Sequence, residues 1–114
     1  MKRRDRDRLQ DILKAADLVA SFTTDFTLDR FLGDALVQSA VLRQLQIVGE
    51  ATRHVSETFK VQHPDIPWRE IVGMRNVIVH GYNEVELEVV WSVVEKFLPE
   101  TAEKVATALR LLDE

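Results

Sequence analysis

Small and apolar residues recur at helical spacing near the start of the chain, from about residue 5 to residue 21. The positions that share one helical face are Leu9, Ile12, Leu13, Ala16, Val19 and Ala20. Thr23, Thr24 and Asp25 then interrupt the pattern. The spacing therefore predicts a first amphipathic helix that buries one side.

A second and longer apolar pattern begins near Thr27, whose hydroxyl suits a helix N-cap, and continues to about Phe59 without a proline. One face of this stretch is small or apolar throughout: Ala35, Leu42, Leu45, Val48, Gly49, Thr52 and Val55. The pattern predicts a single helix of roughly thirty residues, about 45 Å long. Such a helix would form the spine of a bundle and offer surface to a second subunit.

The segment from His63 to Pro67 is the clearest break in the chain. Pro67 suits the first turn of another helix, which the pattern predicts from Trp68 to about Val79. Gly81 is expected to end this helix, and Asn83 is expected to cap the next one.

The last third of the chain predicts one helix with its buried stripe at Leu87, Val90, Trp91, Val94 and Leu98. Pro99 is expected to end or kink that helix, and a final helical segment follows to about Leu112. Nothing in the pattern indicates a parallel sheet. We therefore expect a single all-α domain over residues 1–114, built as a bundle of four to five helices.

The composition of the chain limits the chemistry and the cellular location that we expect for this domain. The chain has 114 residues and no cysteine, which excludes disulfides, thiolate zinc sites and cysteine nucleophiles and fits a reducing cytoplasm. Apolar runs fall well short of the ~20 residues that span a bilayer, so no membrane partner is expected. A cytoplasmic location is the prediction.

Charge is unevenly distributed along the chain. The first eight residues carry five basic and two acidic side chains, net +3; since the whole chain carries −4, the remaining 106 residues carry −7. An acidic body argues against a broad nucleic-acid-binding face but leaves room for a small cationic site. The basic leader suits either a nucleic-acid arm or a solvated first helical turn, and the interspersed Asp5 and Asp7 favour the second interpretation.

Several familiar chemical signatures are missing from the sequence. The four glycines stand singly, so no glycine-rich phosphate loop is present, and no two histidines lie one helical turn apart. We therefore expect no bound metal and no cofactor.

The segment that stands out chemically contains Arg75, Asn76, His80 and Tyr82. His80 near a helix end suits proton transfer, Arg75 offers a forked cationic donor for a phosphate, and Asn76 could fix the His tautomer or bind the phosphate. Such a set can cleave RNA without a metal. An Arg and a His at a helix end can also simply cap carbonyl groups.

Positions five apart in a straight helix lie about 140° apart around its axis, so Arg75 and His80 would not converge on one regular helix. Convergence requires His80 to lie at a frayed helix end, or requires a second copy of the chain across a two-fold axis. Both routes place the site at a helix terminus near a subunit interface.

Arg75, His80, Gly81 and Tyr82 resemble the R-x4-H-x-Y motif of the HepT-like branch of the HEPN superfamily, which are all-helical endoribonuclease toxins of bacterial and archaeal toxin–antitoxin pairs. Residues 45–51, residues 66–74, and Trp91 with Leu98-Pro99 are also similar to segments of that family. The resemblance covers nearly the whole chain.

The resemblance implies a HEPN-like fold and a metal-independent RNase of a type VII-like HepT/MNT system. Arg75 and His80 of two subunits would line a shared cleft in a homodimer. In this branch the motif tyrosine, here Tyr82, is the residue that a cognate MNT-type nucleotidyltransferase modifies with AMP, which silences the toxin. RNA, a second copy of the chain and that antitoxin are thus the implied partners.

One further group of polar residues lies on a common face of the second predicted helix: Ser39, Arg43, Gln46, Glu50 and Arg53. This group is either a solvated stripe or part of the site, with Glu50 and Arg43 facing Arg75 and His80. A different class of function also stays open, in which the chain is a non-catalytic nucleotide- or partner-binding subunit of a nucleotidyltransferase complex. A purely structural helical dimer is the third alternative.

Overall fold

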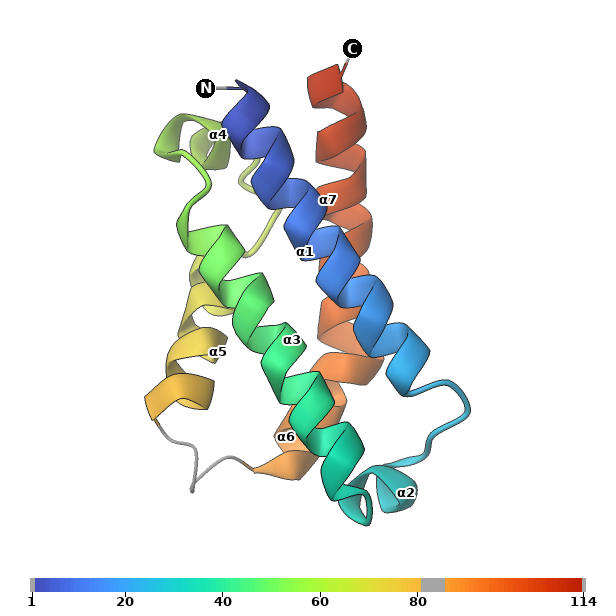
Figure 1. Cartoon of the computed structure of the whole chain (residues 1–114). Coiled ribbons are helices and arrows are strands. Elements are labelled where there is room, and N and C mark those ends of the chain that lie inside the picture. Colours follow the sequence, from blue (N-terminus) through green and yellow to red (C-terminus); the bar gives the residue numbers. More distant parts are fainter. Residues whose placement is uncertain (1, 81–85, 114) are drawn as a thin grey trace.

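Four rods of helix run alternately down and up the molecule (Figure 1). The computed structural model describes the backbone of residues 2–80 and 86–113, and the side chains of residues 4–74 and 86–113. These parts are helical and contain no strand, which confirms the all-α prediction. The rods are α1 (Lys2–Phe22), α3 (Ala35–Arg53), α5 (Trp68–His80) and the combined α6 (Leu87–Ser92) and α7 (Leu98–Asp113). Two short helices, α2 (Leu28–Leu32) and α4 (Glu57–Gln62), connect them.

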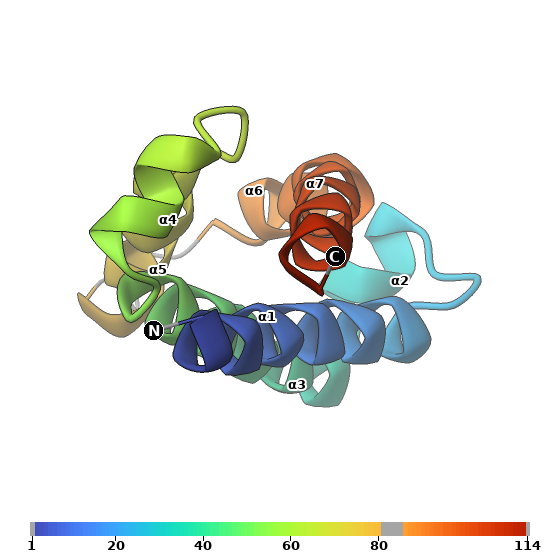
Figure 2. The ribbon, with the colours of Figure 1, turned by 90° about the horizontal axis from the view of Figure 1, so that it is seen from above.

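Helix α3 packs against both α1 and α5, and α7 packs against α1. Seen from above, α1 and α3 lie next to each other along one side of the bundle, and α7 lies on the other side (Figure 2). Most positions of the predicted apolar faces are buried: Leu9, Ile12 and Val19 of α1, and Leu45 and Val48 of α3, are at most 1% exposed. Ala20 and Ala35 are exposed instead, and the fully buried Val41 was not among the predicted positions. The helical period of the sequence therefore identified most of the core of these two helices.

The single helix of about thirty residues predicted after Thr27 is wrong, because the structure divides that stretch into α2, α3 and α4. At the first break, an Asp34 carboxylate oxygen accepts a hydrogen bond from the backbone N–H of Val37 (3.0 Å) and so starts α3. The Gln38 amide donates to the carbonyl groups of Phe31 (2.9 Å) and Leu32 (3.1 Å). These bonds satisfy backbone groups that a helix end would otherwise leave unpaired.

The second break depends on a contact between residues far apart in the sequence. Asp5 of α1 is only 6% exposed, and its carboxylate accepts hydrogen bonds from the backbone N–H (2.9 Å) and the hydroxyl (2.8 Å) of Ser56. The Ser56 hydroxyl accepts in turn from the backbone N–H of Phe59 (3.1 Å) and caps α4. Asp5 therefore fixes the turn between α3 and α4, a role that the sequence pattern did not predict.

Replacing Asp5 by Ala is expected to lower the free energy of unfolding by about 1–3 kcal/mol, because the Ser56 backbone donor would lose its partner in a half-buried position. Urea denaturation measures the effect. Asp7→Ala is the matched control, since Asp7 is exposed and two residues away on the same helix. A double-mutant cycle with Ser56→Ala should give a coupling energy well above zero, and strict additivity would contradict the role of Asp5.

The basic leader forms the first turns of α1, in which Arg4 and Asp7 are exposed and Asp5 is buried. Arg6 Nε lies 2.6 Å from an Asp113 carboxylate oxygen and so joins the first helix to the last one. The two ends of the chain accordingly lie at the same end of the bundle (Figure 1).

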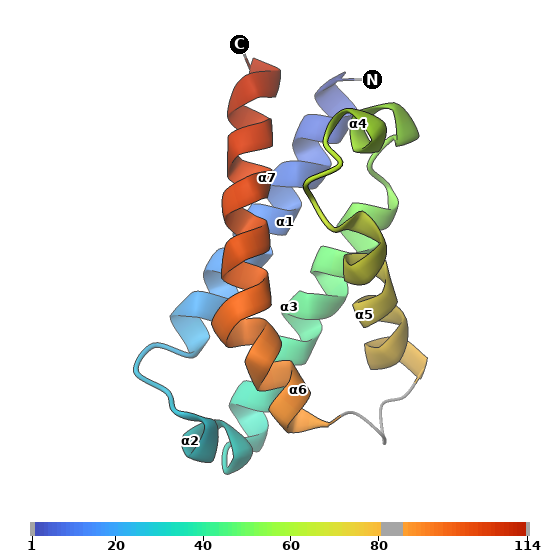
Figure 3. The ribbon, with the colours of Figure 1, turned by 180° about the vertical axis from the view of Figure 1, so that it is seen from behind.

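Pro99 does not end its helix. The rod of α6 and α7 continues through it, with a π-helical turn at Val93–Phe97 immediately before α7 (Figure 3). In that turn the backbone N–H of Leu98 donates to the carbonyl of Val93, five residues earlier. Because proline has no N–H and crowds the carbonyl four residues before it, a widened turn here accommodates Pro99 without breaking the rod.

Candidate active site

Helix α5 carries three residues of the predicted site, Arg75, Asn76 and His80, and packs against α3. Its start is fixed by Trp68, whose indole N–H donates to the His63 carbonyl (3.0 Å), and by Ile66, which is 2% exposed. The predicted helix from Trp68 to about Val79 is thus confirmed, and α5 continues through His80.

The side chains of Arg75, Asn76 and His80, the whole of Tyr82, and the expected caps at Gly81 and Asn83 lie outside the described residues. The next described helix, α6, begins at Leu87, after extended backbone at Glu86. For Arg75, Asn76 and His80, the structure therefore gives the position of the backbone on α5.

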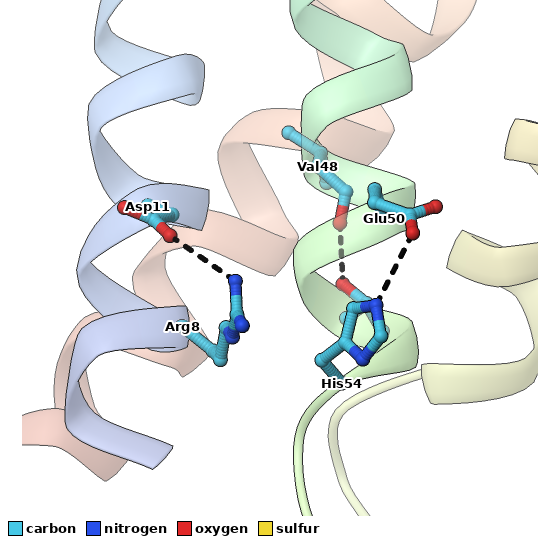
Figure 4. A network of polar contacts seen from close by, with 6 residues as sticks. Arg8, Asp11, Val48, Glu50 and His54 are labelled. Carbon is cyan, nitrogen blue, oxygen red and sulfur yellow. Dashed lines mark hydrogen bonds and ion pairs between the residues drawn. The ribbon is translucent and has the colours of Figure 1, made fainter. Parts of the chain in front are cut away.

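Glu50, a predicted supporting residue, lies on α3, the helix against which α5 packs. Its Oε1 atom is 3.2 Å from His54 Nε2 and 4.0 Å from Arg53 Nη1 (Figure 4). His54 is the C-cap residue of α3. Glu50 thus contacts two exposed residues on its C-terminal side, Arg53 and His54.

Arg43, the other predicted supporting residue of α3, lies two turns before Glu50 and is exposed. Its Nη1 atom donates to the Gln46 side-chain oxygen at 3.5 Å, which is a long hydrogen bond. Arg43 and Glu50 line the same groove, so the structure brings these two predicted residues together on one surface.

The groove has a volume of about 350 Å³ and is lined by residues of two helices, Arg8 and Asp11 of α1 and Arg43, Gln46, Ile47, Glu50 and Ala51 of α3. Arg8 extends from α1 into the space beside α3 (Figure 4). Its guanidinium is 3.9 Å from Asp11, at the outer limit of an ion pair. The sequence could not assign Arg8 to this groove, because it stood out only as part of the basic leader.

A second cavity, of about 450 Å³, lies where α4 meets the start of α5. Trp68, Lys60 and Arg69 are among its lining residues, together with Glu57 and Glu70. Its described lining includes neither Arg43 nor Glu50.

Over the described ranges, histidine and acidic side chains form no cluster of three or more that could hold a metal ion. Within the same ranges, no helix has the length and apolar character needed to cross a membrane.

The chain is an all-helical bundle with an Arg/His motif on α5 and Glu50 on the neighbouring helix α3. Comparison with known proteins identifies the family that has this fold and motif. The chain matches the HepT-like family, described as "Ribonuclease HepT-like", over residues 12–108. It therefore belongs to the HepT-like ribonuclease family.

Two relatives cover most of the chain. One, named "Probable ribonuclease HepT", from Thermococcus cleftensis, is 41% identical over 99 residues, which are 87% of this chain and 90% of the relative. The other, named "Putative RNase MJ1380", from Methanocaldococcus jannaschii, is 35% identical over 97 residues, 85% of this chain and 89% of the relative. No solved structure matches the chain.

Proposed function

We propose that this chain is a metal-independent endoribonuclease that acts as the toxin of a toxin–antitoxin pair. The observation that carries the proposal is membership of the HepT-like ribonuclease family together with the Arg75–His80–Tyr82 motif. The relatives named as ribonucleases extend over the same region of the chain.

The proposed reaction needs proton transfer and charge stabilisation. His80 helps to remove the proton from a ribose 2′-hydroxyl, whose oxygen attacks the adjacent phosphorus. The bond from phosphorus to the 5′-oxygen of the next nucleotide breaks, and that oxygen takes up a proton, leaving a 2′,3′-cyclic phosphate and a 5′-hydroxyl end. Arg75 stabilises the charge that builds on the non-bridging oxygens, and Asn76 assists by binding the phosphate or fixing the His80 tautomer.

Glu50 and Arg43 support this site from α3. The packing of α3 against α5 supports the proposal that the Glu50 carboxylate orients the Arg75 guanidinium. His54 and Arg53, in turn, restrain the Glu50 carboxylate.

The proposed active form is a homodimer. Since α5 remains helical through His80, positions 75 and 80 lie about 140° apart around one axis, which disfavours convergence within one regular helix. A second copy of the chain across a two-fold axis supplies the missing half of the site, so that both copies line one cleft.

Tyr82 is the proposed point of control. A cognate MNT-type nucleotidyltransferase transfers AMP from ATP to its hydroxyl, which loses its proton as pyrophosphate is released. The product carries a bulky anion two residues from His80. Negative charge at that place would repel the RNA backbone and so silence the toxin.

Expression of this chain alone is expected to arrest growth, and co-expression of a cognate nucleotidyltransferase is expected to restore it. Mass spectrometry should then find the mass of one or more AMP groups on the peptide that contains Tyr82, and Tyr82→Phe should abolish both the added mass and the rescue. Harmless expression combined with tight nucleotide binding would instead favour a non-catalytic binding subunit.

A further inference from the structure

The groove between α1 and α3 contains an arginine, Arg8, to which the proposed reaction gives no role. Two arginines from different helices, Arg8 and Arg43, line it, although they are 35 positions apart in the sequence. Its apolar lining is provided by Ile47 and Ala51. Glu50, which belongs to the proposed catalytic region, also lines the groove.

Arginines from both helices gather around this groove. The lining itself carries two arginines and the two carboxylates of Asp11 and Glu50. Arg4 lies one helical turn before Arg8, Asp7 lies one turn before Asp11, and Arg53 lies 4.0 Å from Glu50. With these neighbours the surface carries four arginines and three carboxylates, a local charge of +1 in a chain of net charge −4.

The guanidinium groups of the groove are only loosely engaged. Arg8 is 3.9 Å from Asp11, and Arg43 is 3.5 Å from the Gln46 amide oxygen. The Arg8–Asp11 ion pair is of the exposed kind that contributes about 0–1 kcal/mol, and the Arg43–Gln46 hydrogen bond is long. A phosphate can therefore replace both contacts at little cost and gain shorter, charge-assisted hydrogen bonds from the planar forks of arginine.

We propose that this groove binds an RNA phosphate next to the scissile one, with Arg8 and Arg43 as its ligands. The inference rests on the proposed ribonuclease function and deepens it by naming a subsite. A volume of about 350 Å³ lies at the low end of the range for small-molecule pockets, which suits a single nucleotide better than a protein segment. Ile47 and Ala51 offer an apolar surface for its sugar or base.

The subsite also explains how an acidic protein holds RNA. The substrate contacts a short cationic track that leads from the N-terminal helix across α3 to the proposed site, and the acidic remainder of the surface stays out of contact. Within the basic leader, Arg8 thus binds the RNA phosphate, whereas Asp5 stabilises the fold through its hydrogen bond to Ser56.

The test measures binding of a short fluorescently labelled 2′-O-methyl oligoribonucleotide, which has no 2′-hydroxyl and so resists the proposed cleavage. Fluorescence anisotropy at several salt concentrations gives both the affinity and its salt dependence. Arg8→Gln is expected to weaken binding roughly tenfold, the effect of losing a hydrogen bond to a charged group. The slope of log K against log salt should fall by about 0.7, the value for one phosphate contact on a single strand.

Two further variants separate the subsite from general effects. Arg8→Lys keeps the charge, so the salt slope should stay near that of the parent while the affinity falls with loss of the fork. Arg110→Gln removes the same charge from an exposed position on α7 and should change neither quantity. Far-UV circular dichroism of each variant checks that the helices are intact.

Unchanged affinity and salt slope in Arg8→Gln would overturn the subsite. The subsite would also be overturned if Arg8→Gln bound RNA normally but did not bind the nucleotidyltransferase, because the groove would then be a protein-docking surface. Cleavage of unmodified RNA by the parent distinguishes the two proposals: if the parent cleaves and Arg8→Gln binds normally, only the subsite fails. A parent that neither cleaves nor binds RNA removes the proposed function itself.

Discussion

Replacing His80 by Ala is expected to reduce the rate of RNA cleavage by about 10²–10⁴-fold, the usual contribution of a general acid or base. In the proposed mechanism this imidazole moves a proton in the transition state, and alanine offers no group that can do so. The measurement is the initial rate of cleavage of a labelled RNA by purified protein, with the oligomeric state checked by light scattering.

His63→Ala is the matched control for this experiment. His63 stacks on the Phe59 ring, with centroids 4.3 Å apart, and lies at the α4–α5 corner outside the proposed site. Its loss should affect stability slightly and leave cleavage near the parental rate. If His80→Ala cleaved RNA as fast as the parent, His80 would have no role in catalysis.

Replacing Leu45 by Ala is expected to cost about 2–5 kcal/mol of stability, the largest effect we predict for a single substitution in the fold. Leu45 is fully buried on α3, which packs against both α1 and α5. The smaller side chain would leave a cavity at the centre of the bundle and loosen the helix that carries Glu50. Urea denaturation measures the loss, at several protein concentrations because association would contribute to apparent stability.

Leu36→Ala supplies the comparison, since Leu36 is on the same helix but 81% exposed. The same chemical change there should stay within about 0.5 kcal/mol. Equal losses at the two positions would contradict the assignment of Leu45 to the core.

The sequence predicted the helices whose ends depend on local signals. The limits of α1 and α5 follow from the Thr23–Asp25 interruption and from the two prolines before Trp68. Thr27 also caps a helix as expected, because its hydroxyl accepts a hydrogen bond from the Arg30 backbone N–H (3.2 Å). Such signals act over three or four residues and are visible in the sequence itself.

The prediction of one long second helix was wrong because the signal that ends α3 is not local. The apolar period of that stretch continues through both breaks, and the break before α4 is stabilised by Asp5, 51 residues away from Ser56. The groove residues show the same limit of sequence patterns. Helical periodicity placed Glu50 and Arg43 on one face of a helix, but it could not show that Arg8 of another helix lies beside them.

The sequence by itself determined the class of fold, the family and the motif residues, because helical period and the Arg75–His80–Tyr82 spacing are properties of the chain written in order. Only the tertiary structure decided where α3 ends and which side chains line the groove beside Glu50. Those features depend on hydrogen bonds and surfaces formed between helices, which exist only after the bundle has brought distant residues together.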